Sequence, residues 1–353
     1  MKKIKVGIIG TGNISRSHMD SYLNNPSVEL YALCDIDEGR LNAAGKEYGI
    51  DKLYTNLDEM LALPELDAVS VTTWNSAHAP CAIAALNAGK HVLCEKPMAT
   101  TVEDAKAMEE AAKKNGKLLM IGFVRRFGDD MKLLKDFQSV DYMGDIYYTK
   151  ATYLRRNGNP MGWYGDKARS GGGPLIDLGV HVIDFVRYAI GNPKPVSVYG
   201  ATFRKLFARE NIKTPKAYVS ASATDHDICD VEDLATAMVR FDNGAVLQIE
   251  ASFSLNIEKD EGKIQLFGSK AGVTVGDTLK FISEVNDYMA DVEIKANSRM
   301  DFDKIFRSEI DHFVDCVING TECRNPAKDG VEIMKILTAI YKSAETGHEV
   351  VIE

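Results

Sequence analysis

The chain has 353 residues, of which 45% are hydrophobic and 26% charged, and its formal net charge is −9. These values are typical of globular proteins and leave room for two domains of ordinary size. The negative charge argues against a nucleic-acid-binding surface, which needs clustered basic residues. Because no apolar run reaches the roughly 18 residues of a membrane span, we expect a soluble, cytoplasmic protein that binds neither nucleic acid nor membrane.

The six cysteines are scattered along the chain and form no C-x-x-C pair. This scatter is typical of buried thiols in a reducing compartment, rather than of a disulfide framework or a zinc site. The segment Asp225–Asp230 (DHDICD) contains metal-ligand residue types, but its spacing matches no strong ligand template. We therefore expect a polar loop there and no metal site.

The first third of the chain alternates strand-like and helix-like segments. Strands are predicted at Ile4–Ile9, Val28–Cys34, Asp67–Thr72, His91–Cys94 and Lys117–Gly122, and helices at Ile14–Leu23, Glu38–Tyr48, His78–Ala88 and Val102–Asn115. Such alternation predicts a parallel sheet with crossover helices. We expect a doubly wound Rossmann domain over residues 1–124.

After residue 125 the pattern changes, and long strands dominate. Helices are predicted near Asp130–Phe137, Leu175–Ile190, Phe302–Asn319 and Ala327–Thr346, with strands that include Asp145–Leu154, Asp233–Phe241 and Ala245–Ser254. The turn Asp242-Asn243-Gly244 favours a hairpin between the last two strands. We expect a second α/β domain over residues 125–353, with a large open, mostly antiparallel sheet and helices on one face.

A glycine-containing turn stands between the first strand and the first helix, in the order Gly10-Thr11-Gly12-Asn13-Ile14-Ser15. Gly10 permits a tight turn, Gly12 lets the backbone approach a pyrophosphate, and the helix N-terminus offers free N–H groups to the anion. Ser15 is small enough for close packing of helix and strand. An ordinary turn without a ligand is the alternative interpretation.

A carboxylate at the end of the second strand sharpens this prediction. Asp35 is placed to bind the ribose hydroxyls and to repel a 2′-phosphate, so NAD is favoured over NADP. Two neighbours leave alternatives open. Arg40 is near enough in sequence to approach a phosphate, and Asp37 is either the ribose partner or an acid that is solvated or caps the next helix.

Glu95-Lys96-Pro97 follows the fourth strand, at the sheet edge where ligands of open α/β folds bind. The proline fixes the backbone and directs the Lys96 ammonium toward that crevice. The alternative is an exposed lysine before a helix that begins with proline.

Asp177 and His181 are four residues apart and share a helix face, with Asp184 on a nearby face. A carboxylate beside an imidazole orients it and tunes its proton affinity, as general acid–base catalysis requires. The preceding Gly171-Gly172-Gly173 lets the backbone come close to a ligand or to the other domain. The alternative is a surface pair, or a core histidine with a satisfied hydrogen bond.

In this order, the residues resemble the Gfo/Idh/MocA family of oxidoreductases, which includes glucose–fructose oxidoreductase and inositol 2-dehydrogenase. The shared motifs are Gly10-x-Gly12, Asp35, Ala88–Pro97, Gly171–Gly173, Asp177-x-Gly179-x-His181-x-x-Asp184 and Val231-Glu232-Asp233 before the strand that ends at Asp242-Asn243-Gly244. The resemblance covers essentially the whole chain. It implies an NAD(H)-dependent enzyme that interconverts a secondary alcohol and a ketone on a sugar, sugar derivative or cyclitol. It also implies a homodimer or homotetramer formed through the C-terminal sheet.

The same resemblance implies roles for three residues. His181 is the acid–base group that takes the hydroxyl proton, Lys96 contacts and polarises the substrate oxygen, and Asp177 orients and charge-balances the site. Two relatives of this fold suggest other activities. One is a tightly bound NAD used transiently in glycoside cleavage or sugar-to-sugar hydride transfer. The other is a non-catalytic dinucleotide-sensing regulator, against which the three retained residues argue.

The chain departs from the family after its third strand. The family often has Thr-Pro-Asn near the nicotinamide ribose, whereas this chain has Thr72-Thr73-Trp74-Asn75, followed by His78. Trp74 either stacks near the cofactor, blocks part of the pocket or lies in the core. The cofactor-side candidates are Thr73, Asn75, His78, Glu95 and Lys96, although His78 alternatively only starts the next helix.

Basic and aromatic residues near these motifs are candidates for binding the substrate. Such side chains bind carboxylates, phosphates or sugar hydroxyls, and the set comprises Arg126, Arg155 and Trp163. For any one arginine, a solvated surface charge is the alternative.

Overall fold

The computed structural model describes residues 3–206, 209, 212–213, 216, 218–276, 278–296 and 298–353. The chain forms two compact units. The first comprises Met1–Val124 and Phe302–Met334, and the second comprises Arg125–Asp301 and Lys335–Glu353. In the described part of the chain, every helix is too short or too polar to cross a membrane.

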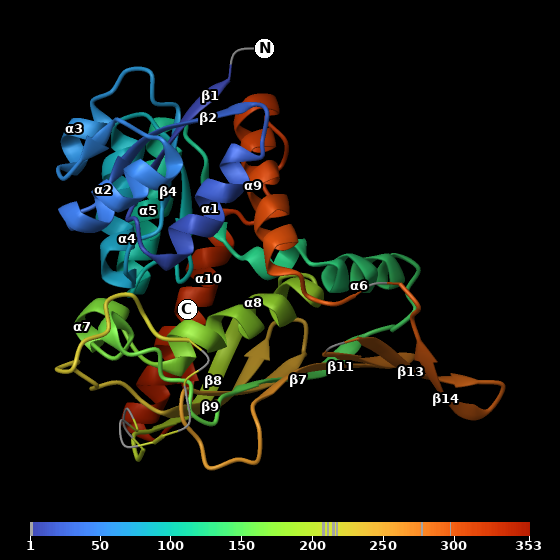
Figure 1. Ribbon diagram of the computed structural model, residues 1–353. Coiled ribbons are helices and arrows are strands. Elements are labelled where there is room, and N and C mark those ends of the chain that lie inside the picture. Colours follow the sequence, from blue (N-terminus) through green and yellow to red (C-terminus); the bar gives the residue numbers. More distant parts are fainter. Residues whose placement is uncertain are drawn as a thin grey trace. The chain divides into compact units, whose positions relative to one another are not determined.

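The first unit is built on a six-stranded parallel sheet (Figure 1). Its strands are β1 (Ile4–Ile9), β2 (Val28–Cys34), β3 (Leu53–Tyr54), β4 (Ala68–Val71), β5 (His91–Glu95) and β6 (Leu119–Gly122), in the order β3-β2-β1-β4-β5-β6. Their apolar side chains are buried because helices cover both faces. This strand order is that of a doubly wound Rossmann sheet, and it brings the carboxyl ends of β1 and β4 together at the switch point where ligands bind.

The helices of this unit begin and end at recognisable residues. They are α1 (Asn13–Leu23), α2 (Glu38–Tyr48), α3 (Leu57–Leu61), α4 (Asn75–Asn87), α5 (Val102–Asn115), α9 (Phe302–Asn319) and the start of α10 (Ala327–Thr346). Asp37 and Thr101 cap the N-termini of α2 and α5, and left-handed Gly49 and Gly116 end them. The short β3 and α3 were not predicted from the sequence.

Helix α9 and the start of α10 belong to the first unit. The boundary expected from the sequence, a single division at residue 125, places them in the second unit. The apolar face of α9 explains this difference. Ile305 and Phe306 form a buried cluster with Val124, against which Ile14 of α1 packs. Figure 1 shows α9 beside α1. The first unit therefore needs a segment that comes late in the chain.

The second unit is built on a nine-stranded sheet (Figure 1). Its strands are β7 (Ile146–Leu154), β8 (Pro195–Phe203), β9 (Leu234–Phe241), β10 (Val246–Ser252), β11 (Glu261–Gly268), β12 (Ala271–Val275), β13 (Leu279–Val285), β14 (Tyr288–Glu293) and β15 (Val350–Val351), in the order β14-β13-β12-β11-β7-β10-β9-β8-β15. Among the described strands of this second sheet, only β7 and β10 pair in parallel. The predicted hairpin joins β9 to β10, and Gly244 takes the positive φ of +85°.

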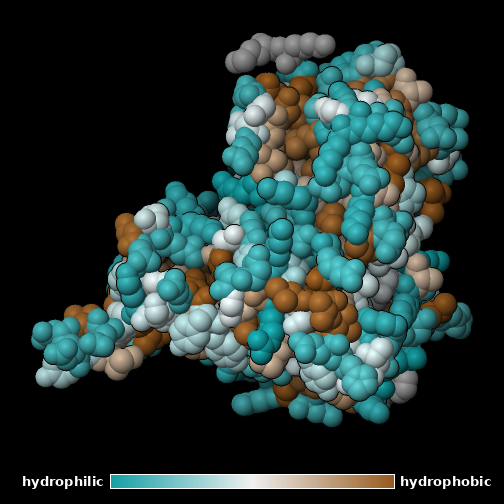
Figure 2. Space-filling view, turned by 180° about the vertical axis from the view of Figure 1, so that it is seen from behind, coloured by the Kyte–Doolittle hydropathy of each residue, from teal (hydrophilic) through white to brown (hydrophobic). Residues whose placement is uncertain are grey.

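Helices pack on one face of this sheet. They include α6 (Asp129–Ser139), the short α7 (Lys167–Ser170), a π-helical turn (Leu175–Gly179) and α8 (Val180–Ala189), with 3₁₀ turns at Val124–Phe127 and Gly162–Tyr164. Gly179 lies against Ile249 and Ala251 of β10, and Gly200 of β8 lies against Ile340 of α10. Tyr199 and Met238 are paired across β8 and β9, and are 56% and 50% exposed. In Figure 2, hydrophobic residues form patches on an otherwise hydrophilic surface.

Candidate active site

The glycine turn after β1 has the geometry of a phosphate-binding loop. Gly10 has φ +91°, and a Cβ there would lie 2.9 Å from the Thr72 carbonyl oxygen and the Thr73 nitrogen. Gly12 is the N-cap of α1, no side chain caps that helix, and a Cβ on Gly12 would meet nothing within 4 Å. The space before the helix N-terminus is therefore open to an anion, which its free N–H groups and dipole favour.

The three residues after Gly12 differ in how far they are buried. The Ser15 hydroxyl is fully buried and donates to the Gly12 carbonyl at 2.6 Å. Asn13 is exposed, whereas the side chain of Ile14 packs inward. Ser15 thus occupies the third position of the motif without disturbing the helix.

Asp35 is buried and tied to the glycine turn. Its Oδ2 accepts hydrogen bonds from the Thr11 amide at 2.6 Å and the Thr11 hydroxyl at 2.9 Å, while Oδ1 accepts from the Asp37 amide at 2.9 Å. Asp37 caps α2 by accepting from the Arg40 amide, and the Arg40 guanidinium lies 3.7 Å from Asp35. A carboxylate has about four lone-pair sites, so Asp35 retains capacity for ribose hydroxyls.

Ile36, next to Asp35, is a residue that sequence reasoning missed. Its side chain is 72% exposed although it is large and apolar. It stands at the carboxyl edge of the sheet, two residues after Cys34, which ends β2. An apolar residue following that carboxylate was the only signal in the sequence.

The segment after β4 is joined to the turn after β5 through His78. His78 is buried, and its ring nitrogens lie 2.7 Å from the Pro97 carbonyl oxygen and 3.1 Å from the Thr73 carbonyl oxygen. Burial lowers the pKa of His78. Asn75, the first residue of α4, is also buried, and Trp74 is the half-buried N-cap of that helix.

Glu95 points into the first unit and fixes the backbone of Lys96. Its Oε1 lies 2.9 Å from Nε2 of the buried His18, and its Oε2 accepts from the Lys96 amide at 3.1 Å. Burial acts to raise the pKa of Glu95, but the His18 hydrogen bond and the neighbouring His18 and Lys96 charges outweigh it, so the pKa is lowered. The Lys96–Pro97 peptide bond is cis. His18 was not predicted, because it is 77 residues from Glu95.

Asp177 and His181 lie on a helix that is otherwise buried in the second unit. Both are half-buried, whereas Leu178–Val180 and Val182–Arg187 are buried. Asp177 lies in the π-helical turn, where the Val180 amide bonds to the Leu175 carbonyl five residues earlier. π-helical turns are rare and occur often at functional sites. The two side chains therefore share the one accessible stripe of this helix.

The half-buried carboxylate of Glu232 holds the start of the same helix. Glu232 accepts hydrogen bonds from the amides of Gly173 and Leu175 at 2.9 and 3.2 Å, and from the Tyr341 hydroxyl at 2.8 Å. Burial raises the pKa of Glu232. A Cβ on Gly172 would lie 2.0 Å from the Tyr341 hydroxyl. The glycine run is thus packed against Tyr341 and Glu232, and Tyr341 was not predicted.

The predicted substrate residues have different surroundings. The Arg126 guanidinium is fully buried, contacts both carboxylate oxygens of buried Asp184 and lies 4.5 Å from the Tyr188 ring. Arg155 is half-buried and donates to the Gly158 carbonyl at 3.2 Å. Trp163 is half-buried and stacks on the neighbouring Tyr164 ring.

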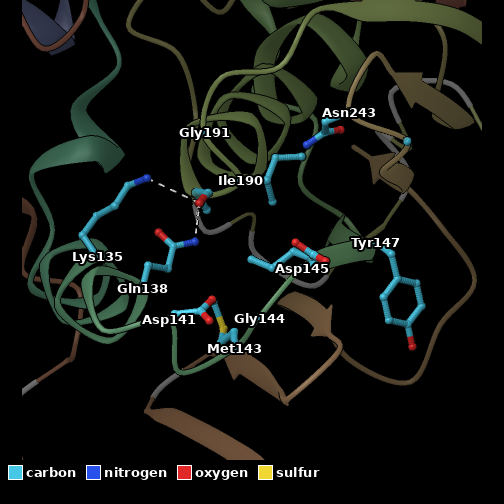
Figure 3. A pocket seen from close by; sticks show the side chains of 13 residues that line it. Lys135, Gln138, Asp141, Met143, Gly144, Asp145, Tyr147, Ile190, Gly191 and Asn243 are labelled. Carbon is cyan, nitrogen blue, oxygen red and sulfur yellow. Dashed lines mark hydrogen bonds between the residues drawn. The ribbon is translucent and has the colours of Figure 1, made fainter.

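A hollow of about 740 Å³ lies elsewhere on the second unit, where α6 meets the end of α8 (Figure 3). None of the predicted site residues lines it. Lys135, labelled in Figure 3, donates to the Tyr188 carbonyl at 2.7 Å and to the Ala189 carbonyl at 3.4 Å. This lysine satisfies the last carbonyls of α8, so we assign it a structural role.

Comparison with known proteins agrees with this architecture. Residues 4–123 match the family model described as "Oxidoreductase family, NAD-binding Rossmann fold", and residues 140–352 match "Oxidoreductase family, C-terminal alpha/beta domain". The chain belongs to the Gfo/Idh/MocA oxidoreductase family. Its first unit therefore carries the NAD-binding fold of this family, as the glycine turn and Asp35 predicted.

Relatives in this family act on sugars and cyclitols, by their names. The chain is 34% identical over 351 residues to a D-glucoside 3-dehydrogenase of Escherichia coli, covering 98% of this chain and 97% of the relative. It is 27% identical to a myo-inositol 2-dehydrogenase of Thermotoga maritima, with 99% of both chains covered.

Solved structures show the same fold. A levoglucosan dehydrogenase in complex with NADH and L-sorbose superimposes with a TM-score of 0.87 at 24% identity, covering 100% of both chains. An aldose-aldose oxidoreductase from Caulobacter crescentus, complexed with glycerol, gives a TM-score of 0.81 at 26% identity, covering 99% of this chain and 100% of that one.

Proposed function

We propose that this protein is an NAD(H)-dependent dehydrogenase that interconverts a secondary alcohol and a ketone on a sugar ring or cyclitol. The observation that carries the proposal is the half-exposed Asp177–His181 pair on an otherwise buried helix. This pair occurs in a chain whose other unit has an open glycine turn with Asp35 beside it. An acid–base pair and a dinucleotide fold together supply what alcohol oxidation needs.

In the proposed reaction, His181 accepts the proton of the substrate hydroxyl. Asp177 orients the imidazole and stabilises its charged form, and the Lys96 ammonium donates a hydrogen bond to the substrate oxygen. Bound NAD, held by the glycine turn and Asp35, would supply the acceptor for the hydride that leaves the carbon. The ketone forms as the C–H and O–H bonds of the alcohol break, and reduction reverses both transfers.

The proposed cofactor contacts follow from the first unit. The backbone of the Gly10–Ile14 turn would hold the pyrophosphate, Asp35 the ribose hydroxyls and the exposed Ile36 the adenine. We keep Thr73 and Asn75 as candidates for the nicotinamide side, as the sequence suggested. Because Glu95 and His78 are buried in hydrogen-bond networks, we propose that they hold the backbone around Lys96 in place.

The proposed substrate contacts come from the half-buried residues Arg155 and Trp163, with Lys96, Asp177 and His181. Full burial against Asp184 favours a structural role for Arg126 instead. The names of the glucoside and inositol relatives support a hydroxyl on a six-membered ring, and the higher identity to the first favours a glucoside.

The test is a screen of glucosides, free sugars, cyclitols and sugar acids as substrates. The absorbance of the NADH that forms measures the reduction of NAD. The variant His181→Asn should lower kcat by roughly 10²–10⁴-fold, the usual contribution of a general acid–base group, and should still bind NADH. His348→Asn, which changes an exposed histidine near the C-terminus, is the control and should retain activity. The proposal fails if no compound reduces NAD, or if His181→Asn turns over like the unmodified protein.

A second candidate is hydride transfer between two sugars by a cofactor that stays bound. The similarity to an aldose-aldose oxidoreductase favours it. Cofactor released from the purified, denatured protein, together with sugar conversion without added NAD, would support this activity. Strict dependence on added NAD would exclude it.

We also propose that the protein forms a homodimer or homotetramer through the C-terminal sheet. The exposed cross-strand pair Tyr199 and Met238 supports an interface there, because large apolar side chains side by side on a sheet are typical of contact surfaces. A cytoplasmic location remains a prediction.

A further inference from the structure

A cluster of metal-ligand residues lies in the first unit, apart from the residues of the proposed function. His312 and Cys316 are one turn apart on α9, and Cys323 lies in the loop that leads to α10. One imidazole nitrogen and the two sulfur atoms all lie within 4.8 Å of one another. Cys316 is buried, and the other two residues are half-buried. Their side chains therefore converge at a partly enclosed point.

The Nε2 atom of His312 borders this cluster and carries no proton. Its Nε2 accepts a hydrogen bond from the Arg324 backbone amide at 2.9 Å. Because an amide N–H only donates, Nε2 is unprotonated. The same nitrogen lies 3.5 Å from the Cys316 sulfur. The histidine thus already has the protonation state of a metal ligand.

The distances suit a tetrahedral zinc ion. Zinc lies about 2.3 Å from a cysteine sulfur and about 2.0–2.1 Å from a histidine nitrogen, so the two ligands are about 3.6 Å apart across a tetrahedral edge. The observed separation of His312 Nε2 and Cys316 Sγ is 3.5 Å. Two thiolates and one imidazole are a ligand set that zinc prefers over magnesium or calcium.

The loop that carries Cys323 is held close to the helix independently of any metal. Asp315, between the two helical ligands in sequence, accepts hydrogen bonds from the Asn319 side-chain amide and the Thr321 hydroxyl. These bonds fold the chain back just before Cys323. Only small side-chain movements are then needed to bring the second sulfur to a bonding distance.

We propose that His312, Cys316 and Cys323 bind a zinc ion, with water in the fourth position. Binding releases the two thiol protons to solvent, and the Arg324 amide gives up its bond to Nε2. The ion would fasten the end of α9 to the segment that pairs with β6, because the Asn325 carbonyl accepts from the Ile121 amide at 3.0 Å. The role is structural and does not depend on the proposed reaction.

The experiment uses the full chain, reduced and stripped of metal with a chelator. Zn²⁺ is titrated in competition with a chromophoric chelator, and Co²⁺ is bound separately to report thiolate ligands by its near-ultraviolet charge-transfer absorption. We expect one ion per chain, thiolate-to-cobalt absorption, proton release and a higher melting temperature with Zn²⁺. Cys323→Ser and His312→Asn should weaken Zn²⁺ binding by at least about tenfold, since even the loss of a supporting partner outside the ligand set costs 10–100-fold.

Cys81→Ser is the matched control, because Cys81 is also half-buried and lies on α4, outside the cluster. It should bind Zn²⁺ as the unmodified protein does. The proposal is overturned if Cys323→Ser keeps full affinity, if bound Co²⁺ shows no thiolate absorption, or if Cys81→Ser weakens binding as much as Cys323→Ser.

Discussion

The two glycines of the nucleotide turn are required for different physical reasons. At Gly10 the backbone has a positive φ, and a side chain would meet backbone atoms that cannot move aside. At Gly12 the φ of −75° suits any residue, and the space around the missing Cβ is open within the protein. Gly10 is thus needed by the fold, whereas the open space at Gly12 leaves room for the proposed cofactor.

This difference leads to a paired prediction. Gly12→Ala should weaken NAD binding by tenfold or more, on the order of 1.4 kcal/mol, because the methyl group occupies space that the pyrophosphate needs. The melting temperature of the Gly12→Ala variant, measured without cofactor, should differ little from that of the wild type. Gly10→Ala should lose both NAD affinity and about 1–3 kcal/mol of stability, since a left-handed conformation and a clash are imposed together. Fluorescence titration with NADH and thermal unfolding measure the two effects.

Gly262→Ala, on β11 in the second unit, is a suitable control, because an added Cβ there meets nothing within 4 Å and the backbone has no positive φ. It should keep both properties. Unchanged NADH binding by Gly12→Ala would mean that the cofactor does not approach this turn.

Some site residues were predictable because their roles depend on near neighbours in the sequence. Gly10, Gly12 and Asp35 are recognisable from a strand, a turn and a helix in succession. His18, Glu232 and Tyr341 act through partners far away in the chain, such as the Glu232–Tyr341 contact across 109 residues. No local pattern reports such a partner. Glu232 stood out in the sequence only as part of the Val231-Glu232-Asp233 motif, and His18 and Tyr341 became visible only in the folded chain.

At the level of elements, α8 is anchored by a buried ion pair behind its accessible stripe. Arg126 and Asp184 have side chains that are 0% and 1% exposed. Removing one partner of such a pair leaves the other charge buried without compensation. The sequence suggested a substrate contact for Arg126, because composition does not reveal which arginines are enclosed.

Arg126→Ala should therefore lower the free energy of unfolding by about 3–5 kcal/mol. Urea denaturation of the purified variant measures this loss. Arg155→Ala, which removes a half-buried arginine, should cost less than about 1.5 kcal/mol, the usual value of a single hydrogen bond. Equal stabilities for the two variants would contradict the assignment of Arg126 to the interior.

The contact between α6 and the end of α8 should respond to pH. Burial and the nearby Arg126 charge lower the pKa of Lys135 from 10.5 to about 8. Between these values the unfolded chain binds more protons than the folded chain, so the contribution of Lys135 to stability rises with pH. It falls again as the pH drops from 10.5 through 8.

The measurement compares wild type with Lys135→Met, which has no titrating group at this position. The difference in unfolding free energy, wild type minus variant, should increase from about pH 8 to about pH 10. Groups that titrate in both proteins cancel in this difference. A difference that is constant or decreases over this range would show that the lysine keeps an ordinary pKa.

The elements themselves were largely predictable, since strands and helices follow from periodicity and capping residues. The predicted Val102–Asn115 helix has the bounds of α5 because Thr101 and Gly116 stop it at both ends. The two-residue β3 and the five-residue α3 are too short to show a period. The π-helical turn before α8 has the same residue pattern as an α-helix, so it was not separable in advance.

For the whole molecule, the exposed face of the large sheet predicts association. Introducing a charge by Met238→Glu next to Tyr199 should shift the protein toward smaller assemblies, because an interface core disfavours unpaired charges. Light scattering after size-exclusion chromatography gives the mass of each variant. Val285→Glu, which changes an exposed apolar residue on β13, tests whether charge anywhere on this sheet has the same effect. An unchanged mass for Met238→Glu would exclude the Tyr199–Met238 surface as an interface.

The division of the chain was the least predictable feature at this scale. The amphipathic pattern of α9 shows that one of its faces is buried, but it does not show against which surface. Its partner, Ile14 on α1, is almost 300 residues away in sequence. The packing of Phe306 therefore assigns α9 to the first unit. The position of α9 late in the sequence does not indicate this assignment.

This assignment has a consequence for how the protein is made. The strands of the first unit leave the ribosome early, but the unit is complete only once Met334 has been synthesised. At about 5–20 residues per second, the roughly 210 residues after Val124 take on the order of 10–40 s to add. During this time α1 lacks the helix that covers it, so the nascent chain exposes an apolar surface that chaperones recognise. Ribosome-bound chains stalled before residue 302 should accordingly be more sensitive to protease in α1 than chains stalled after residue 334.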